Sequence, residues 1–338
     1  MDRDDYLYSS GVVRSLENRS LSQNDIERMV DAPDLSTAFK VFHDTDYFDN
    51  VQDLKPEQFL LALDEDLKQV FVRIKALSPN EEIVKFIFMR NDFRNMKLLY
   101  KEALNGKNIE EYLSQMGNED PEKLKKAIAG EKVEILPYCQ RAIDYVKKRV
   151  EDESKGATPA LIERWFDRKY FKEYGDQAKV LGSSFIEDFV KLQLDIANIK
   201  TFIRAKLMNL SKEYIVSEIL YKQSSDEEPG LSLEFFASIV SLSLEDALAK
   251  IRRHLSIKGQ GVLDQYLNDR SLEQLEKNLE NLELEYLRGA KLIDRGPELI
   301  LAYYYSKRNG IRNTRLIMTA QANQLPSLEV KKLLRELY

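Results

Sequence analysis

The stretch Arg90–Leu99 reads RNDFRNMKLL, and the stretch Arg308–Ile317 reads RNGIRNTRLI. Four of their first six positions are identical, namely Arg90/Arg308, Asn91/Asn309, Arg94/Arg312 and Asn95/Asn313. Between the two stretches, Gln193–Phe202 reads QLDIANIKTF, with Asp195, Asn198 and Lys200 at the places of Asp92, Asn95 and Lys97. A motif that returns in this way indicates three diverged copies of one unit.

The sequence around each copy has helical periodicity. An apolar approach precedes each motif, reading IVKFIFM, FIEDFVKL and LILAYYYS in chain order. Elsewhere, leucines recur at spacings typical of an amphipathic helix, as at Leu272, Leu275, Leu279, Leu282 and Leu287. Alternating Val, Ile and Thr runs bounded by Asn-Gly or Asp-Gly do not occur, so β-hairpins are not indicated. We therefore predict an all-α chain.

Polar segments rich in turn-forming residues mark the expected boundaries between repeats. Met116–Glu122 reads MGNEDPE and Lys222–Gly230 reads KQSSDEEPG. They predict helical repeats over 1-117, 118-225 and 226-338. A third polar segment, Glu151–Pro159, is expected to be a loop inside the second repeat, with Thr158 and Pro159 opening the next helix.

Composition limits the classes of partner. The chain has 338 residues, a net charge of −6 and a single cysteine, Cys139, which fits a reducing compartment and a place in the core. The first ten residues carry no apolar signal segment. The longest weakly charged stretch, Leu231–Leu244, is shorter than the ~20 residues that span a bilayer. An acidic chain has no general reason to bind nucleic acid or anionic lipid, so a role at a membrane requires protein partners.

Basic residues form a stripe along each motif helix. In the first copy Arg90, Arg94, Lys97 and Lys101 fall on one helical face. The corresponding residues are Lys200 and Arg204 in the second copy and Arg308, Arg312 and Arg315 in the third. Like charges at this spacing cost an isolated helix ~0.2–0.5 kcal/mol per pair, so the stripes need acidic counterparts. Those counterparts belong either to the chain itself or to a partner, and the expected partner-binding set is these residues without Lys101.

The three asparagines of the motif predict a structural role more than a direct role in function. Asparagine is a poor residue for the middle of a helix, because its side chain competes for backbone groups. Asn95, Asn198 and Asn313 are therefore expected to make structural hydrogen bonds between helices, together with Asp92 and Asp195 as the acidic positions of the repeat motif.

Signatures of chemistry are missing from the sequence. There is no phosphate-binding loop of the G-x-x-x-x-G-K-[ST] type and no complete dinucleotide loop. His43 and His254 lie far apart without other metal-ligating residues nearby, and Asp44, Asp46 and Asp49 lack the glycine and glutamate of a calcium loop. We expect no catalytic residue, no metal and no cofactor.

Several longer segments resemble one family. They are RNDFRNMKLLYKEALNGK (90–107), ERWFDRKYFKEY (163–174), LQLDIANIKTFIRAKL (192–207) and LAYYYSKRNGIRNTRLIMTAQANQLP (301–326). Over essentially its whole length the chain is similar to the C subunit of bacterial and archaeal V/A-type ATPases, called the d subunit in eukaryotic vacuolar ATPases. Gly310 departs from the acidic residue at Asp92 and Asp195, and Ala197 interrupts the second stripe.

The resemblance implies three similar helical units around a pseudo-threefold axis, forming a funnel. It implies that the wide end receives the central stalk, made of the D and F subunits, and that the narrow end sits on the membrane proteolipid ring. Such a rotor subunit carries torque between ATP turnover and ion transport at the cytoplasmic face of the membrane and does no chemistry itself. The alternatives are a free-standing helical-repeat scaffold of a soluble complex and an enzyme whose site is assembled from distant residues.

Overall fold

The computed structural model describes residues 2–45, 54–106, 108–153, 156–220 and 231–338. Every regular element within these ranges is a helix, which confirms the predicted all-α class. The chain divides into two compact units, the first made of Met1–Ile83 with Ser256–Tyr338 and the second of Val84–Leu255. The division into three repeats and the funnel stay predictions.

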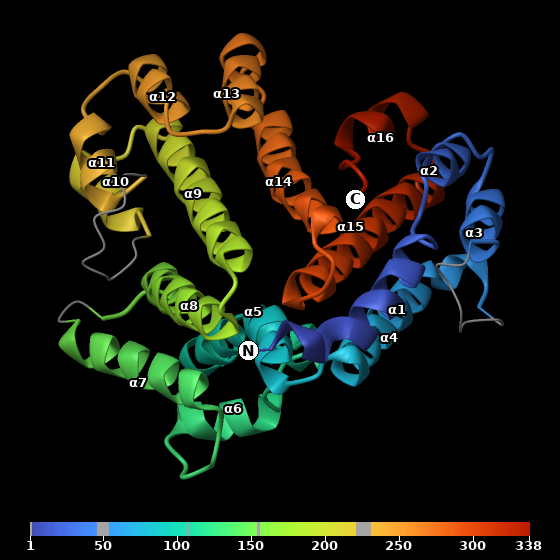
Figure 1. The fold of residues 1–338 in the computed structure, drawn as a ribbon. Coiled ribbons are helices and arrows are strands. Elements are labelled where there is room, and N and C mark those ends of the chain that lie inside the picture. Colours follow the sequence, from blue (N-terminus) through green and yellow to red (C-terminus); the bar gives the residue numbers. More distant parts are fainter. Residues whose placement is uncertain (1, 46–53, 107, 154–155, 221–230) are drawn as a thin grey trace. The chain divides into compact units, whose positions relative to one another are not determined.

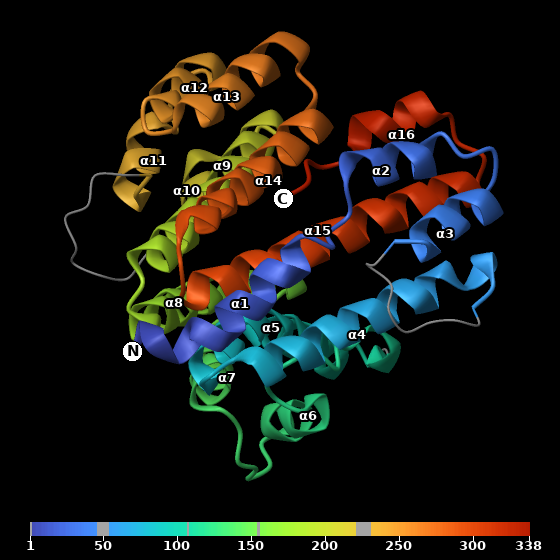
Figure 2. The ribbon, with the colours of Figure 1, turned by 45° about the vertical axis from the view of Figure 1, so that its right-hand side comes forward.

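The first unit contains the N-terminal helices and the C-terminal ones (Figure 1). Its elements are the 3-10 helix η1 (Arg3–Tyr6), α1 (Leu7–Glu17), α2 (Gln23–Val30), α3 (Leu35–His43), η2 (Pro56–Gln58), α4 (Phe59–Leu77), α13 (Ile257–Asp269), α14 (Leu272–Arg288), η4 (Gly289–Leu292), α15 (Pro297–Ala322) and α16 (Ser327–Leu333). The long helix α15 lies beside α1, α3 and α4, and Figure 2 shows the same neighbours of α15 from another side.

The second unit contains the middle of the chain. Its elements are α5 (Glu81–Asn105), which begins in the first unit, η3 (Glu110–Tyr112), α6 (Pro121–Ala129), α7 (Pro137–Asp152), α8 (Pro159–Leu181), α9 (Ser184–Leu207), α10 (Lys212–Glu218), α11 (Leu233–Ile239) and α12 (Leu244–Arg252). Consecutive helices α6 to α9 pack against one another in sequence order.

Local sequence explains where the helices begin and end. The hydroxyl of Thr158 accepts a hydrogen bond from the backbone N–H of Leu161, and Pro159 occupies the first turn, so α8 begins where the sequence predicts. The same helix ends at Gly182, whose φ of +64° favours glycine. Of the predicted breaks, Met116–Glu122 follows η3 and extends into the first turn of α6, and Lys222–Gly230 lies outside the described residues.

Each unit has its own apolar core. In the first unit, buried residues of α2, α3 and α4 pack with Ile311, Ile317 and Met318 of α15. In the second, aromatic rings join α5 to α8, as in the stacked pair Phe86 and Tyr174 with centroids 4.1 Å apart. Aromatic stacking of this kind stabilises a core beyond its buried area by about 0.5–1.5 kcal/mol per pair. These cores fix the helices that carry the three motifs.

The three motif helices share one local plan. Each of α5, α9 and α15 is a long helix of 24 to 26 residues, and each is followed by a short helix, η3, α10 or α16. The residue after each short helix has extended backbone. We call the segment that starts there the return segment.

Candidate functional site

The motif asparagines each make the same paired contact with a return segment. The side-chain Nδ2 donates to the backbone C=O of one residue, and the backbone N–H of that same residue donates to Oδ1. We call this arrangement a clamp. The clamps are Asn95 with Ser114 (2.8 and 2.9 Å), Asn198 with Leu220 (2.7 and 2.8 Å) and Asn313 with Arg335 (2.9 and 3.0 Å).

The chemistry of the amide explains why asparagine stands here. Its side chain places a donor and an acceptor side by side, which matches the N–H and C=O of one backbone residue. All three asparagines are buried, with at most 1% of their surface exposed. The sequence predicts a hydrogen bond between helices, whereas the bonds observed run from the long helix to the irregular return segment. Each clamp therefore fixes a return segment against its own long helix.

A buried carboxylate reinforces the first clamp. Asp92 accepts hydrogen bonds from the backbone N–H of Glu119 (3.0 Å), Asn118 Nδ2 (3.0 Å) and the Tyr138 hydroxyl. Its side chain is fully buried, and burial raises the pKa of Asp92 to about 6 against the effect of these hydrogen bonds. A Cβ at Gly117 would lie 2.4 Å from Asp92 Oδ1, so the return segment passes this carboxylate at a point where only glycine fits.

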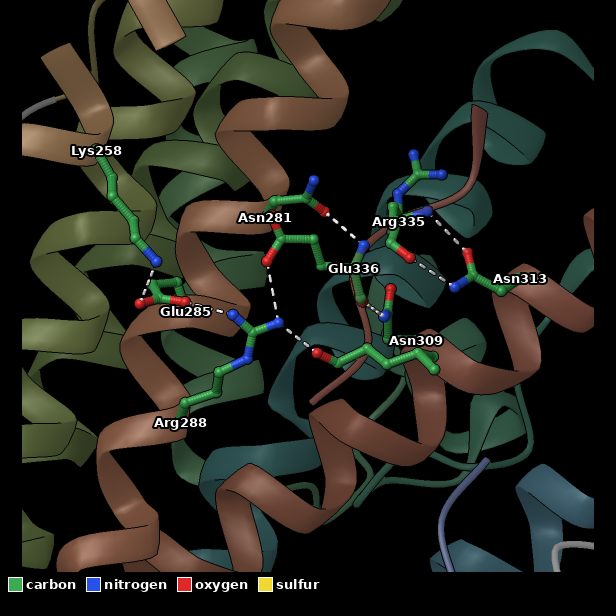
Figure 3. A network of polar contacts seen from close by, with 9 residues as sticks. Lys258, Asn281, Glu285, Arg288, Asn309, Asn313, Arg335 and Glu336 are labelled. Atoms are coloured by element: carbon green, nitrogen blue, oxygen red, sulfur yellow. Dashed lines mark hydrogen bonds and ion pairs between the residues drawn. The ribbon is translucent and has the colours of Figure 1, made fainter. Parts of the chain in front are cut away.

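The acidic position differs among the three copies. Burial also raises the pKa of Asp195, to about 7, while Lys191 opposes the shift. In the third copy Gly310 is buried at the corresponding place and brings no carboxylate. The third return segment is held instead by side chains of α14 and α15, several of which are shown in Figure 3.

Part of the basic stripe is paired within the chain. Lys97 on α5 forms an ion pair with Asp167 of α8, and Lys101 pairs with Glu163 of the same helix. On α15, Arg312 lies 2.8 Å from Glu280 of α14. These pairs join a motif helix to its neighbour within one unit, which is the internal pairing that the sequence left open.

The other stripe residues have varied surroundings. Arg315 lies 2.6 Å from Asp64 of α4, and the guanidinium of Arg308 lies 5.8 Å from the ring centroid of Tyr305. Arg94 on α5 and Arg204 on α9 are exposed, and Lys200 is half-buried. Arg90 also lies on α5. The stripes thus combine residues used internally with residues that reach solvent.

Sequence reasoning missed the backbone partners of the clamps. Ser114, Leu220 and Arg335 have unlike side chains, and the contact uses none of their side-chain atoms. Their only shared signal is distance along the chain, which is 19, 22 and 22 residues from the asparagine. An ion pair was also missed, in which the buried Glu173 of α8 accepts from the exposed Arg141 of α7.

The ATP synthase (C/AC39) subunit family model matches residues 9–333, nearly the whole chain. The chain belongs to this family. Among curated C/AC39 relatives, the C subunit of the V-type sodium ATPase of Enterococcus hirae is 23% identical over 338 residues and is aligned over 99% of each chain. The C subunit of the A-type ATP synthase of Thermococcus kodakarensis is 22% identical, covering 98% of this chain and 90% of the relative. That of Methanocaldococcus jannaschii is 23% identical, covering 97% and 86%.

Membership of the C/AC39 family confirms the resemblance found in the sequence. The chain is a structural and coupling subunit of a V/A-type ATPase rather than a catalytic one. Across the part of the chain that the structure describes, no helix is both long and apolar enough to cross a membrane.

Proposed function

We propose that this C/AC39 subunit is a rotor component that links the central stalk, made of the D and F subunits, to the membrane proteolipid ring. It transmits torque between ATP turnover and ion transport. The observation that carries the proposal is the match of the family over residues 9–333, with relatives named as C subunits of a V-type ATPase and an A-type ATP synthase aligned over 99% and 90% of their lengths. In this role the chain lies on the cytoplasmic face of the membrane and is held there by its protein partners.

The clamps support a mechanical role. A part that transmits torque must resist bending between its helices, and its connecting segments are the weakest places. Each clamp closes one such segment onto a long helix through two hydrogen bonds, and the first two pairs are buried. Opening either of these two clamps would leave buried backbone groups unpaired at about 1–3 kcal/mol each, so the first two return segments are stiff.

The stripes supply the proposed contact with the stalk. We propose that Arg90, Arg94, Lys97, Lys200, Arg204, Arg308, Arg312 and Arg315 border the surface that meets it. Arg90, Arg94 and Arg204 are exposed and so can reach a partner. Lys97, Arg312 and Arg315 already have acidic partners and contribute less. The stalk end is not expected to share the pseudo-threefold symmetry predicted for this subunit. Flexible basic side chains suit such a partner, since they can reach acceptors at several positions.

The test is the set of proteins that purify with the tagged chain from native membranes in mild detergent. The rotor function predicts the D and F subunits and the proteolipid ring, in fixed proportion to the chain and absent from an untagged control. Recovery from the soluble fraction with other proteins and without any ring component would instead identify a free-standing scaffold.

A further inference from the structure

The third return segment, Leu334–Tyr338, is attached mainly through polar groups near the surface. We call it the strap. Besides the clamp at Arg335, the backbone of Glu336 is held on both sides, because its C=O accepts from Asn309 Nδ2 (2.5 Å) and its N–H donates to Asn281 Oδ1 (3.1 Å). Figure 3 shows these groups of α14 and α15 converging on the strap.

Charge and apolar contacts complete the attachment. Arg288 Nη2 lies 2.9 Å from the Glu336 carboxylate and also donates to the C=O of Leu337. Arg335 Nε lies 2.7 Å from Glu280. Leu334 and Leu337 are half-buried and pack against the core of the first unit. The strap thus combines two leucines with one acidic side chain between them.

The strap differs from the first return segment in its exposure to water. Both hydrogen bonds of the Asn95 clamp are buried, and Asp92 adds a buried carboxylate. Both bonds of the Asn313 clamp are only partly buried, and Glu336 is exposed. Water can replace partly exposed hydrogen bonds, and salt screens exposed ion pairs, so the polar attachments of the strap are easier to break than those of the other two return segments, although the Tyr338 hydroxyl at its end is buried.

We propose that the strap is releasable and that the groups beneath it form a binding site for an extended acidic peptide segment. The site, called here the strap site, consists of Asn281 and Arg288 on α14 and Asn309 and Asn313 on α15. Its three asparagines bind backbone N–H and C=O groups and so accept an extended chain of any sequence. Arg288 selects a carboxylate, and the core beneath selects leucine on each side of it.

The chemistry of the occupant follows from the strap itself. A segment that reads leucine, any residue, acidic residue, leucine reproduces the backbone hydrogen bonds, the ion pair of Glu336 and the leucine packing of residues 334–337, and only the pair between Arg335 and Glu280 is left out. Main-chain pairing supplies affinity, and the side chains at alternate places supply specificity, as in other modes of extended-peptide recognition. This inference concerns an additional partner and stands independently of the stalk and ring contacts.

The first experiment uses the full chain and a labelled peptide of residues 333–338, LLRELY. In the variant E336K/L337A the strap is weakened while every residue of the strap site is intact. We expect the peptide to bind this variant at least about tenfold more tightly than wild type, because less of the site is occupied in cis. Adding Arg288→Gln to the same variant should remove that gain, and a peptide with Lys in place of Glu should not bind.

Equal binding to wild type and to the weakened variant, or binding that survives Arg288→Gln, would overturn the proposal. Circular dichroism of each variant shows whether it is folded. The second experiment needs no variant, since it follows amide hydrogen exchange in the wild type. Raising the salt from about 0.05 to about 1 M should speed exchange at Arg335 and Glu336 several-fold and leave Ser114 unchanged. Equal protection of Arg335 and Ser114 at both salt concentrations would show a strap that is not released.

Discussion

Asn95 and Asn313 hold their partners through the same two hydrogen bonds, but the Asn95 pair is buried and the Asn313 pair is partly exposed. We therefore expect the same side chain in the same motif to contribute different amounts to stability. In the first copy the two bonds to Ser114 are buried, so water does not readily replace the asparagine. In the third, water can reach the groups of Arg335.

Truncating these two asparagines should separate the two cases. We expect Asn95→Ala to lower the free energy of unfolding by about 2–4 kcal/mol, since two buried backbone groups lose their partners. Asn313→Ala should cost about 1 kcal/mol, because solvent replaces part of the contact. Urea unfolding followed by circular dichroism measures both. Equal losses in the two variants would show that burial does not set the value of a clamp.

The Asp92 carboxylate predicts a dependence of stability on pH. Its pKa is about 6 in the folded chain and about 3.9 in an unfolded one. The folded state thus keeps a proton that the unfolded state has lost, so this group makes stability fall as the pH rises from about 4 to about 6. Two pKa units correspond to about 3 kcal/mol.

The variant Asp92→Asn cannot titrate and should lose this dependence. Its unfolding free energy minus that of wild type should rise by up to about 3 kcal/mol between pH 4 and pH 7. Asp144→Asn, at an exposed position of α7, is the matched control and should show no such trend. A difference between Asp92→Asn and wild type that stays constant with pH would mean that Asp92 does not titrate in this range.

A substitution at Gly117 tests how closely the first return segment packs against Asp92. A methyl group there would meet Asp92 Oδ1 at 2.4 Å, and three hydrogen bonds hold that carboxylate in position. We expect Gly117→Ala to lower the thermal midpoint and to cost about 1–3 kcal/mol, as overpacking does elsewhere. Gly11→Ala, inside α1 where nothing lies within 4 Å of the added Cβ, is the control and should stabilise the chain by up to about 1 kcal/mol through helix propensity. A fully stable Gly117→Ala chain would show that the return segment can move away.

Charge reversal at Arg94 tests the proposed stalk contact. Arg94 is exposed, so Arg94→Glu should change the unfolding free energy by no more than about 0.5 kcal/mol. Binding to purified D and F subunits should weaken. The effect should be largest at low salt, where charges at the edge of an interface have the most influence on the association rate. Arg312→Glu is a poorer probe, since it would place two negative charges together at Glu280. Surface plasmon resonance measures the rates.

The control for this experiment is Lys148→Glu, an exposed position of α7 outside the stripes. It changes net charge by the same amount and should leave binding to the D and F subunits as in wild type. If Arg94→Glu and Lys148→Glu bind the stalk subunits equally well, the stripe of α5 has only an internal role.

Much of the fold could be predicted because it depends on local patterns. Periodic leucines predict α14, and a capping threonine followed by proline predicts the start of α8. The partners of the charged residues depend on distant segments instead. Arg315 and Asp64 are 251 residues apart, and no local pattern marks Asp64 as the counterpart. Sequence reasoning could therefore require acidic partners for the stripe without naming them.

For a similar reason, the sequence predicts the asparagine of each clamp but not its backbone partner. Asn198 in the middle of a helix signals a specific hydrogen bond, since the residue disfavours that setting. Its partner is the peptide group of Leu220, and a peptide group is present at every position. Only the three-dimensional path of the return segment selects which one is bound.

A contact that recognises only the peptide group leaves the identity of the bound residue open. Serine, leucine and arginine occupy the clamped position in the three copies. The predicted origin of the three copies from one unit would thus allow mutations at this position that leave the helical framework intact. The clamped position can therefore carry a different side chain in each copy while its backbone contact stays the same. An internal repeat built in this way can become asymmetric in what it binds while remaining symmetric in how it is braced.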